Sequence, residues 1–178
     1  MRLRLRLLWL ILASLWRKPL EILDESILSL RVLPNDIDIS KITNDRYLAL
    51  TDLGRIDLAV RNGLLQTMFK RRWAPLAYVV MIRFRHPLVV FQKYQLRTQI
   101  IYWDDDSLYL RQRFARSGRI VATGYVYATL LGPDSRVSPQ DIFAVARQHP
   151  VRPEMPEVVR RLQELNAMIH LEQGEIVG

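Results

Sequence analysis

One long helix constrains the fold of this chain more than any other feature. Over residues 44–62, apolar side chains recur at spacings of three and four residues and so share one helix face. They are Ala49, Leu53, Ile56 and Val60, widened by Tyr47 and Leu50. Asn44 is predicted as the N-cap and Gly63 as the C-cap. Gly54 inside the helix costs about 1 kcal/mol relative to alanine, which indicates that the helix backbone approaches a sheet closely.

Strand-like runs surround this helix. Each is either apolar with β-branched residues or alternates apolar and polar residues, which is typical of a buried or half-buried strand. They cover residues 26–33 before the helix and residues 76–84, 94–102, 108–114 and 120–131 after it. Asp104-Asp105-Asp106 and Arg116-Ser117-Gly118 predict hairpin turns between consecutive strands.

This order of elements predicts an α+β protein with a curved antiparallel sheet wrapped around the long helix. Such a sheet has an exposed edge, and pairing two edges across a two-fold axis would cover it, so we expect a homodimer or a dimer of dimers. After Pro133 the pattern is helical again, with Ser138 capping a short helix and residues 157–170 forming another before a loose tail. The predicted parts are an N-terminal helix (1–22), the sheet-and-helix domain (23–135) and a helical extension (136–178).

The first 20 residues combine arginines with a short apolar run and with Trp9 and Trp16. The run is far shorter than the roughly 20 residues that a membrane span requires. Three alternatives stay open: a helix docked on the domain or on a dimer partner, a helix lying on a membrane surface, and a signal peptide. Trp16, Arg17 and Lys18 stand where a small-residue cleavage site would be, which counts against the last.

The net charge of +8 favours anionic partners, among which are nucleic acids, membrane surfaces and phosphate-bearing small molecules. No helix-turn-helix or aromatic single-strand platform is evident, so we expect no nucleic-acid binding. The chain has no cysteine and three histidines, which argues against disulfides and against a metal site. We expect a cytoplasmic protein, with membrane association left open.

Three segments resemble the hotdog thioesterases of the 4-hydroxybenzoyl-CoA thioesterase-like group. They are DIDISKITNDRYLALTDLGR (36–55), IRFRHPL (82–88) and ARSGRIVATGYV (115–126), and the resemblance covers residues 24–135. It implies the hotdog fold and hydrolysis of acyl thioesters. The chain departs from the group's pattern in three places. The expected histidine is replaced by Lys41 or is missing, Thr43 replaces the first asparagine of a pair, and the loop is about one residue short.

Thioester hydrolysis needs stabilisation of negative charge on the carbonyl oxygen and an activated nucleophile. The amides at the start of the helix near Asn44 offer the first, and in families similar to this sequence the thioester carbonyl lies there. A carboxylate supplies the second, and Asp38 is the first candidate and Asp36 the second. The alternatives are that both aspartates form turns in a tight loop and that Asn44 serves only as a cap.

Candidate substrate contacts lie at the helix start and on the strands that follow the helix. They are Lys41, Thr43, Tyr47, Arg83, Arg85 and Arg116, with Arg111, Arg113 and Arg119 nearby in the sequence. Arginine binds phosphate groups well because its donors form a planar fork. Coenzyme A is expected as part of the substrate, and no separate cofactor is expected. The main rival is a non-catalytic acyl-binding hotdog protein, and a dehydratase on the same fold is the other.

Overall fold

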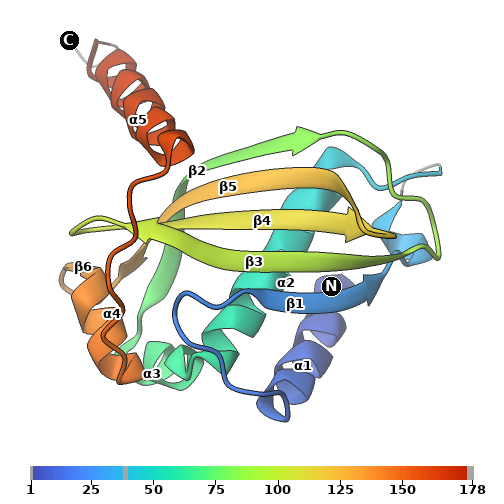
Figure 1. The fold of residues 1–178 in the computed structure, drawn as a ribbon, viewed down its shortest axis with the longest axis horizontal. Coiled ribbons are helices and arrows are strands. Elements are labelled where there is room, and N and C mark those ends of the chain that lie inside the picture. The colour runs from blue at the N-terminus through green and yellow to red at the C-terminus, as the bar shows by residue number, and fades with distance from the viewer. Residues whose placement is uncertain (1, 38–39, 176–178) are drawn as a thin grey trace.

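A computed structural model of the chain describes residues 2–37 and 40–175 (Figure 1). Its helices are α1 (Arg2–Leu15), α2 (Asn44–Arg61), α3 (Leu64–Arg71), α4 (Pro139–Ala146) and α5 (Glu157–Glu175), with a 3-10 turn at Pro34–Asp36. Its strands are β1 (Ser26–Arg31), β2 (Ala74–Phe84), β3 (Lys93–Trp103), β4 (Leu108–Arg116), β5 (Arg119–Leu131) and β6 (Arg136–Val137).

The strands form one antiparallel sheet in the order β1-β3-β4-β5-β2, with β6 added beside β5. Both hairpins predicted from the sequence are confirmed, since β3 pairs with β4 and β4 with β5. β2 does not pair with its neighbour in sequence. It crosses the sheet to pair with β5, from Ala74 opposite Leu131 to Phe84 opposite Ala122. The sheet therefore curls around α2, which lies against one of its faces (Figure 1).

The contact between α2 and the sheet is close. Leu50 and Leu53 of α2 are fully buried. A Cβ atom on Gly54 would collide with Oγ1 of Thr98 on β3 and would lie 3.1 Å from Cδ2 of Leu96. The close approach predicted from this glycine is confirmed. Nearby, Nε2 of Gln112 on β4 donates to the carbonyl oxygen of Thr51 at 2.8 Å, so a hydrogen bond joins helix and sheet.

Some helix boundaries differ from the sequence prediction, and one helix was missed. Thr43, not Asn44, is the N-cap of α2, because its backbone is extended while Asn44 is already helical. The prediction missed α3, which follows the left-handed Gly63 (φ 74°) directly. Leu64 is buried and Met68, one turn later, packs on the same core, so a helical spacing was present in the sequence. α5 extends five residues past the predicted end at His170.

The N-terminal helix is docked on the domain, as one of the sequence alternatives proposed. Leu10 and Ser14 of α1 are buried. Ser14 and Arg17 donate hydrogen bonds to Asp57 of α2, at 2.5 Å and 3.1 Å, and Ser26 of β1 donates to the other oxygen of the same carboxylate. Arg61 lies 3.6 Å from it. One fully buried carboxylate thus joins α1, β1 and α2.

No helix within residues 2–37 and 40–175 is both long and apolar enough to cross a membrane.

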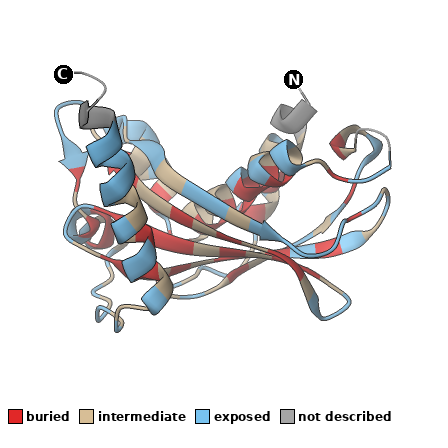
Figure 2. Ribbon diagram, turned by 90° about the horizontal axis from the view of Figure 1, so that it is seen from above, coloured by how far each residue is buried: buried red, intermediate tan, exposed pale blue. Residues whose placement is uncertain are grey.

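Figure 2 shows the buried residues gathered along the sheet and α2, whereas α5 is mostly exposed beyond its first turns. Val159 and Leu162 anchor those first turns.

Asp57→Ala should lower the free energy of unfolding by about 3–5 kcal/mol, because it leaves buried cationic and hydroxyl donors without their acceptor. Asp52→Ala on the same helix is the matched control. The Asp52 side chain is 57% exposed and pairs with Arg55, so its loss should cost at most about 1 kcal/mol. Urea unfolding followed by circular dichroism measures both, and equal losses would contradict this role of Asp57.

Candidate active site

The N-terminus of α2 lies where three segments meet at one end of the sheet (Figure 1). They are the loop before α2, described at residues 34–37 and 40–43, the first turn of α2, and the connection between β2 and β3 over residues 85–92. The amide of Ile42 donates to the carbonyl oxygen of Leu88 at 2.9 Å. The amide of Leu88 donates in turn to the hydroxyl of Tyr47 at 3.2 Å. These bonds hold the loop, the connection and the helix together.

The first turn of α2 is not capped by its N-cap residue. Thr43 makes no side-chain hydrogen bond to a helix amide. Its hydroxyl donates to the carboxylate of Asp45, and this bond is the main reason that the pKa of Asp45 lies below its ordinary value. The amides of Arg46 and Tyr47 donate to the carbonyl oxygen of Thr43, at 3.1 Å and 3.2 Å. Because the Thr43 side chain provides no cap, the amides of Asn44 and Asp45 are the candidate donors at the positive end of the helix dipole. Such a helix end can bind a carbonyl oxygen that acquires negative charge.

An apolar cavity of about 390 Å³ lies along the second half of the same helix. Helices α1 to α4 and strands β2 to β5 contribute its lining. The apolar lining residues include Leu53, Ile56, Ala59, Leu65, Met68, Leu108, Leu110, Ala128 and Ile142. Asp52, Arg55, Asn62 and Thr129 are the polar side chains at its wall. The cavity is therefore suited to a hydrocarbon chain or to another apolar group.

Comparison with known proteins agrees with this architecture. Residues 32–162 match the profile of the thioesterase-like superfamily. The chain belongs to this superfamily. Protein THEM6 of Danio rerio is 31% identical over 163 residues, which cover 89% of this chain and 78% of that protein. Protein THEM6 of Drosophila melanogaster is 28% identical, and the match covers 70% of this chain and 64% of that protein.

Solved structures share the fold, and two of them are described as a thioesterase or a probable thioesterase. The gentisyl-coenzyme A thioesterase BH1999 superposes with a TM-score of 0.60 at 18% identity, over 69% of this chain and all of that one. The probable thioesterase YbaW of Escherichia coli gives 0.61 at 18%, over 67% and 94% of the two chains. SAV2348 of Staphylococcus aureus, solved in complex with CoA, gives 0.60 at 14%, over 79% and 94%. The predicted hotdog fold is confirmed.

Of the two candidate aspartates, the structure describes Asp36. Asp36 is buried, and its carboxylate lies 2.8 Å from a guanidinium nitrogen of Arg6 on α1. The same carboxylate accepts the amide of Leu33 at 3.0 Å. The negative charge of Asp36 is thus paired with the positive charge of Arg6 within the protein. Asp38, the first candidate, lies outside the described residues.

The other residues predicted at the helix start occupy different environments. Asn44 is the first helical residue of α2 and is exposed. Thr43 is half-buried at the N-cap. Tyr47 is buried between Phe84 and Phe114, with ring centroids 5.1 Å and 4.9 Å away, and burial raises its pKa above the ordinary value. Tyr47 therefore supports the site from the core as a neutral phenol.

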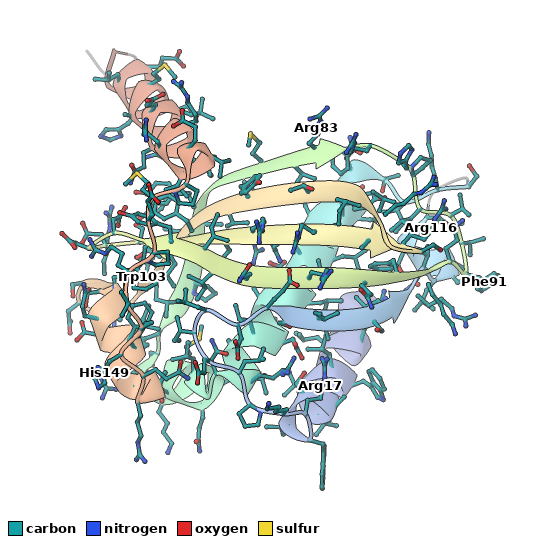
Figure 3. The ribbon with its side chains drawn as sticks, viewed as in Figure 1. Arg17, Arg83, Phe91, Trp103, Arg116 and His149 are labelled. Atoms are coloured by element: carbon teal, nitrogen blue, oxygen red, sulfur yellow. The ribbon has the colours of Figure 1, made fainter. Side chains whose placement is uncertain are left out.

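Lys41, Arg83, Arg85 and Arg116 lie on or beside the connection between β2 and β3. Lys41 is exposed and forms an isolated bridge with Val89 beside the helix start. Arg83 and Arg85 are exposed at the end of β2 and just after it, and Arg83 is labelled at that edge in Figure 3. Arg116 donates to Gln92 at 2.8 Å in the connection between β2 and β3.

Arg111 and Arg113 lie elsewhere. Gln112, between them on β4, reaches α2, so these two arginines point to the opposite face of the sheet. There Arg113 pairs with Glu25 at 2.6 Å and Arg111 donates to Gln99 at 2.8 Å.

Arg6 was missed as part of the site, because nothing in the sequence links a basic residue at the chain's start to a loop 30 residues later. In addition to its bond with Asp36, Arg6 donates to the carbonyl oxygen of Arg31 at 2.9 Å. Among the described residues, no three His, Asp or Glu side chains come together as a possible metal site.

Proposed function

We propose that this protein hydrolyses acyl thioesters, with acyl-CoA as the substrate class. The observation that carries the proposal is the N-terminus of α2, where Thr43 provides no cap, with an apolar cavity further along the same helix. The thioesterases of the same fold support it, and the CoA complex of SAV2348 supports CoA as the thiol component.

In the proposed reaction, the thioester carbonyl oxygen lies against the amides at the start of α2, which stabilise the negative charge that develops on it. Asp38 acts as the general base that removes a proton from water as the water oxygen attacks the carbonyl carbon. The carbon–sulfur bond then breaks, and the thiolate of CoA takes up the proton. Asp36, held by Arg6, positions the loop that carries Asp38.

The cavity suggests which acyl groups are preferred. Its first lining residue on α2 is Asp52, eight residues after Asn44, which is about 12 Å along the helix axis. A carbonyl group at the helix start would therefore place only a long acyl chain in the cavity. We propose long, apolar acyl groups rather than acetyl as the substrates.

A non-catalytic acyl-binding protein is the second candidate. Two observations favour it: the histidine of the resembling group is replaced by Lys41 or is missing in this chain, and Asp36 is engaged by Arg6. Both candidates predict binding of acyl-CoA, and only the first predicts release of free CoA.

A panel of saturated acyl-CoA substrates from acetyl to palmitoyl tests the proposal. Release of free thiol should be faster with long acyl chains than with acetyl, because the cavity stabilises the chain by about 0.8 kcal/mol per buried methylene. Ala59→Phe, which narrows the cavity, should shift the preference towards shorter chains. Tight binding with no release of thiol from any substrate would support the non-catalytic alternative.

Asp38→Asn should lower the hydrolysis rate by at least about a hundredfold, because the amide cannot accept the proton of water. Its free energy of unfolding should stay within about 0.5 kcal/mol of the parent protein. Asp36→Asn is the comparison. It should destabilise the fold by about 3 kcal/mol or more, because Arg6 loses its charged partner. Full activity of the folded Asp38→Asn variant would rule out Asp38 as the base.

We also propose that two copies pair through β2. Within the described residues, no strand pairs with the outer edge of β2. Its large apolar side chains Leu76, Val80, Met81 and Phe84 are between 37% and 42% exposed. Phe84 contacts Tyr47 in the first turn of α2, so a partner at this edge would lie close to the candidate site. Edge-to-edge pairing would satisfy the free backbone groups of β2.

Val80→Glu combined with Met81→Glu should convert the dimer to a monomer, because the charges would be buried opposite each other in the paired strands. Sedimentation velocity measures the change. The hydrolysis rate should fall with it if the partner completes the site. Val151→Glu, at a residue that is 86% exposed and outside the sheet, is the control and should leave the dimer intact. A parent protein that sediments as a monomer would refute the pairing.

A further inference from the structure

The outward face of α1 is apolar over its whole second half. Its exposed residues are Leu8 (57% exposed), Trp9 (69%), Leu12 (53%) and Leu15 (66%), and Trp16 (90%) follows directly after the helix. Their spacing places them along one side of the helix, opposite the buried Leu10 and Ser14. We call these five residues the Leu/Trp face. Few soluble proteins leave so many large apolar side chains together in water without a partner.

Charge around the Leu/Trp face is positive. The first 20 residues contain no aspartate or glutamate. Lys18, just after the helix, and Arg31, at the end of the neighbouring β1, are both exposed. Arg17 lies beside Lys18 at the C-terminal end of α1 (Figure 3), and its side chain is 35% exposed next to Asp57. An apolar face with tryptophans and a basic border is typical of a helix that lies in the interface of an anionic bilayer.

The apolar surface continues from α1 onto the sheet. A groove of about 490 Å³ separates α1 from β1 and the residues that follow it. Trp9 belongs to both the Leu/Trp face and this groove, and Leu28, Leu30 and Leu33 line the opposite wall together with Arg31. Leu33 is itself 37% exposed.

The helix that carries this face is held rigidly on the domain. Ser14 and Arg17 bind the buried Asp57 at its C-terminal end, and Arg6 binds Asp36 nearer its N-terminal end. Asp36 belongs to the loop that leads into α2. A surface bound to the Leu/Trp face would therefore lie at a constant distance from the candidate active site.

We propose that the Leu/Trp face is a docking surface for anionic phospholipid bilayers. On binding, α1 lies in the plane of the membrane and keeps its contacts with the rest of the domain. Leu8, Leu12 and Leu15 enter the apolar boundary, Trp9 and Trp16 lie at the level of the headgroups, and Lys18 and Arg31 contact lipid phosphates. The inference does not depend on thioester hydrolysis.

Co-sedimentation of the full chain with vesicles tests the proposal. The protein should bind vesicles of phosphatidylserine and phosphatidylcholine in equal parts, and bind phosphatidylcholine alone at least about tenfold more weakly. Leu12→Asn with Trp16→Ser should weaken binding by about tenfold or more, and Lys18→Glu with Arg31→Glu by a similar factor. Tryptophan emission should shift to the blue on binding, and Trp16→Phe should reduce that shift.

Exposed apolar residues elsewhere provide the control. Phe69 on α3 is 75% exposed and Leu171 on α5 is 70% exposed, so Phe69→Ser with Leu171→Ser removes similar apolar area and should leave vesicle binding unchanged. The proposal would be overturned if this control lost as much vesicle binding as the Leu12→Asn, Trp16→Ser variant, or if the parent protein bound neither kind of vesicle. So would a change in sedimentation of the Leu12→Asn, Trp16→Ser variant without vesicles, because the face would then bind a second copy of the chain.

Discussion

The close packing of α2 against the sheet is the constraint on which the rest of the structure depends. Gly54 lets the helix backbone come within contact of Thr98 and Leu96, where any side chain would collide. The sheet can curl around the helix only at this distance, and the hydrogen bond from Gln112 to Thr51 forms only there. The position of both ends of α2, and with them the candidate site and the cavity, follows from this contact.

The ends of α2 serve different purposes in the proposed function. The first turn offers amide donors for the thioester carbonyl oxygen, near the loop that carries Asp36 and Asp38 and next to exposed Lys41. The last turns contribute apolar side chains to the cavity, which α3 and α4 help to enclose. An acyl thioester likewise has a polar reacting centre at one end and an apolar chain at the other. One helix with a polar start and an apolar end can therefore orient both parts of the substrate.

The N-terminal helix α1 is attached to the segments that position the candidate site. Buried carboxylates of Asp36 and Asp57 bind α1 at two points, and both lie on segments that position the site: the loop before α2, and α2 itself. Because a buried ion pair is costly to break, α1 behaves as part of the domain rather than as a tether. The outward Leu/Trp face then gives the whole molecule a defined orientation relative to whatever surface binds it.

The sequence by itself determined the helices and strands that depend on local periodicity and turn residues. The predicted order, both hairpins and the close approach at Gly54 are confirmed, since each depends on patterns within a few residues. The place of the candidate site at the start of α2 followed from the resembling segment, and the role of Asp38 stays a prediction.

Only the tertiary structure decided what depends on residues far apart in the chain. It placed β2 beside β5, paired Asp36 with Arg6, buried Tyr47 in the core, and put Arg111 and Arg113 on the far face of the sheet. The physical reason is that burial and charge pairing are set by which elements meet in space. Periodicity tells which face of an element is apolar, and it cannot tell which neighbour that face will contact.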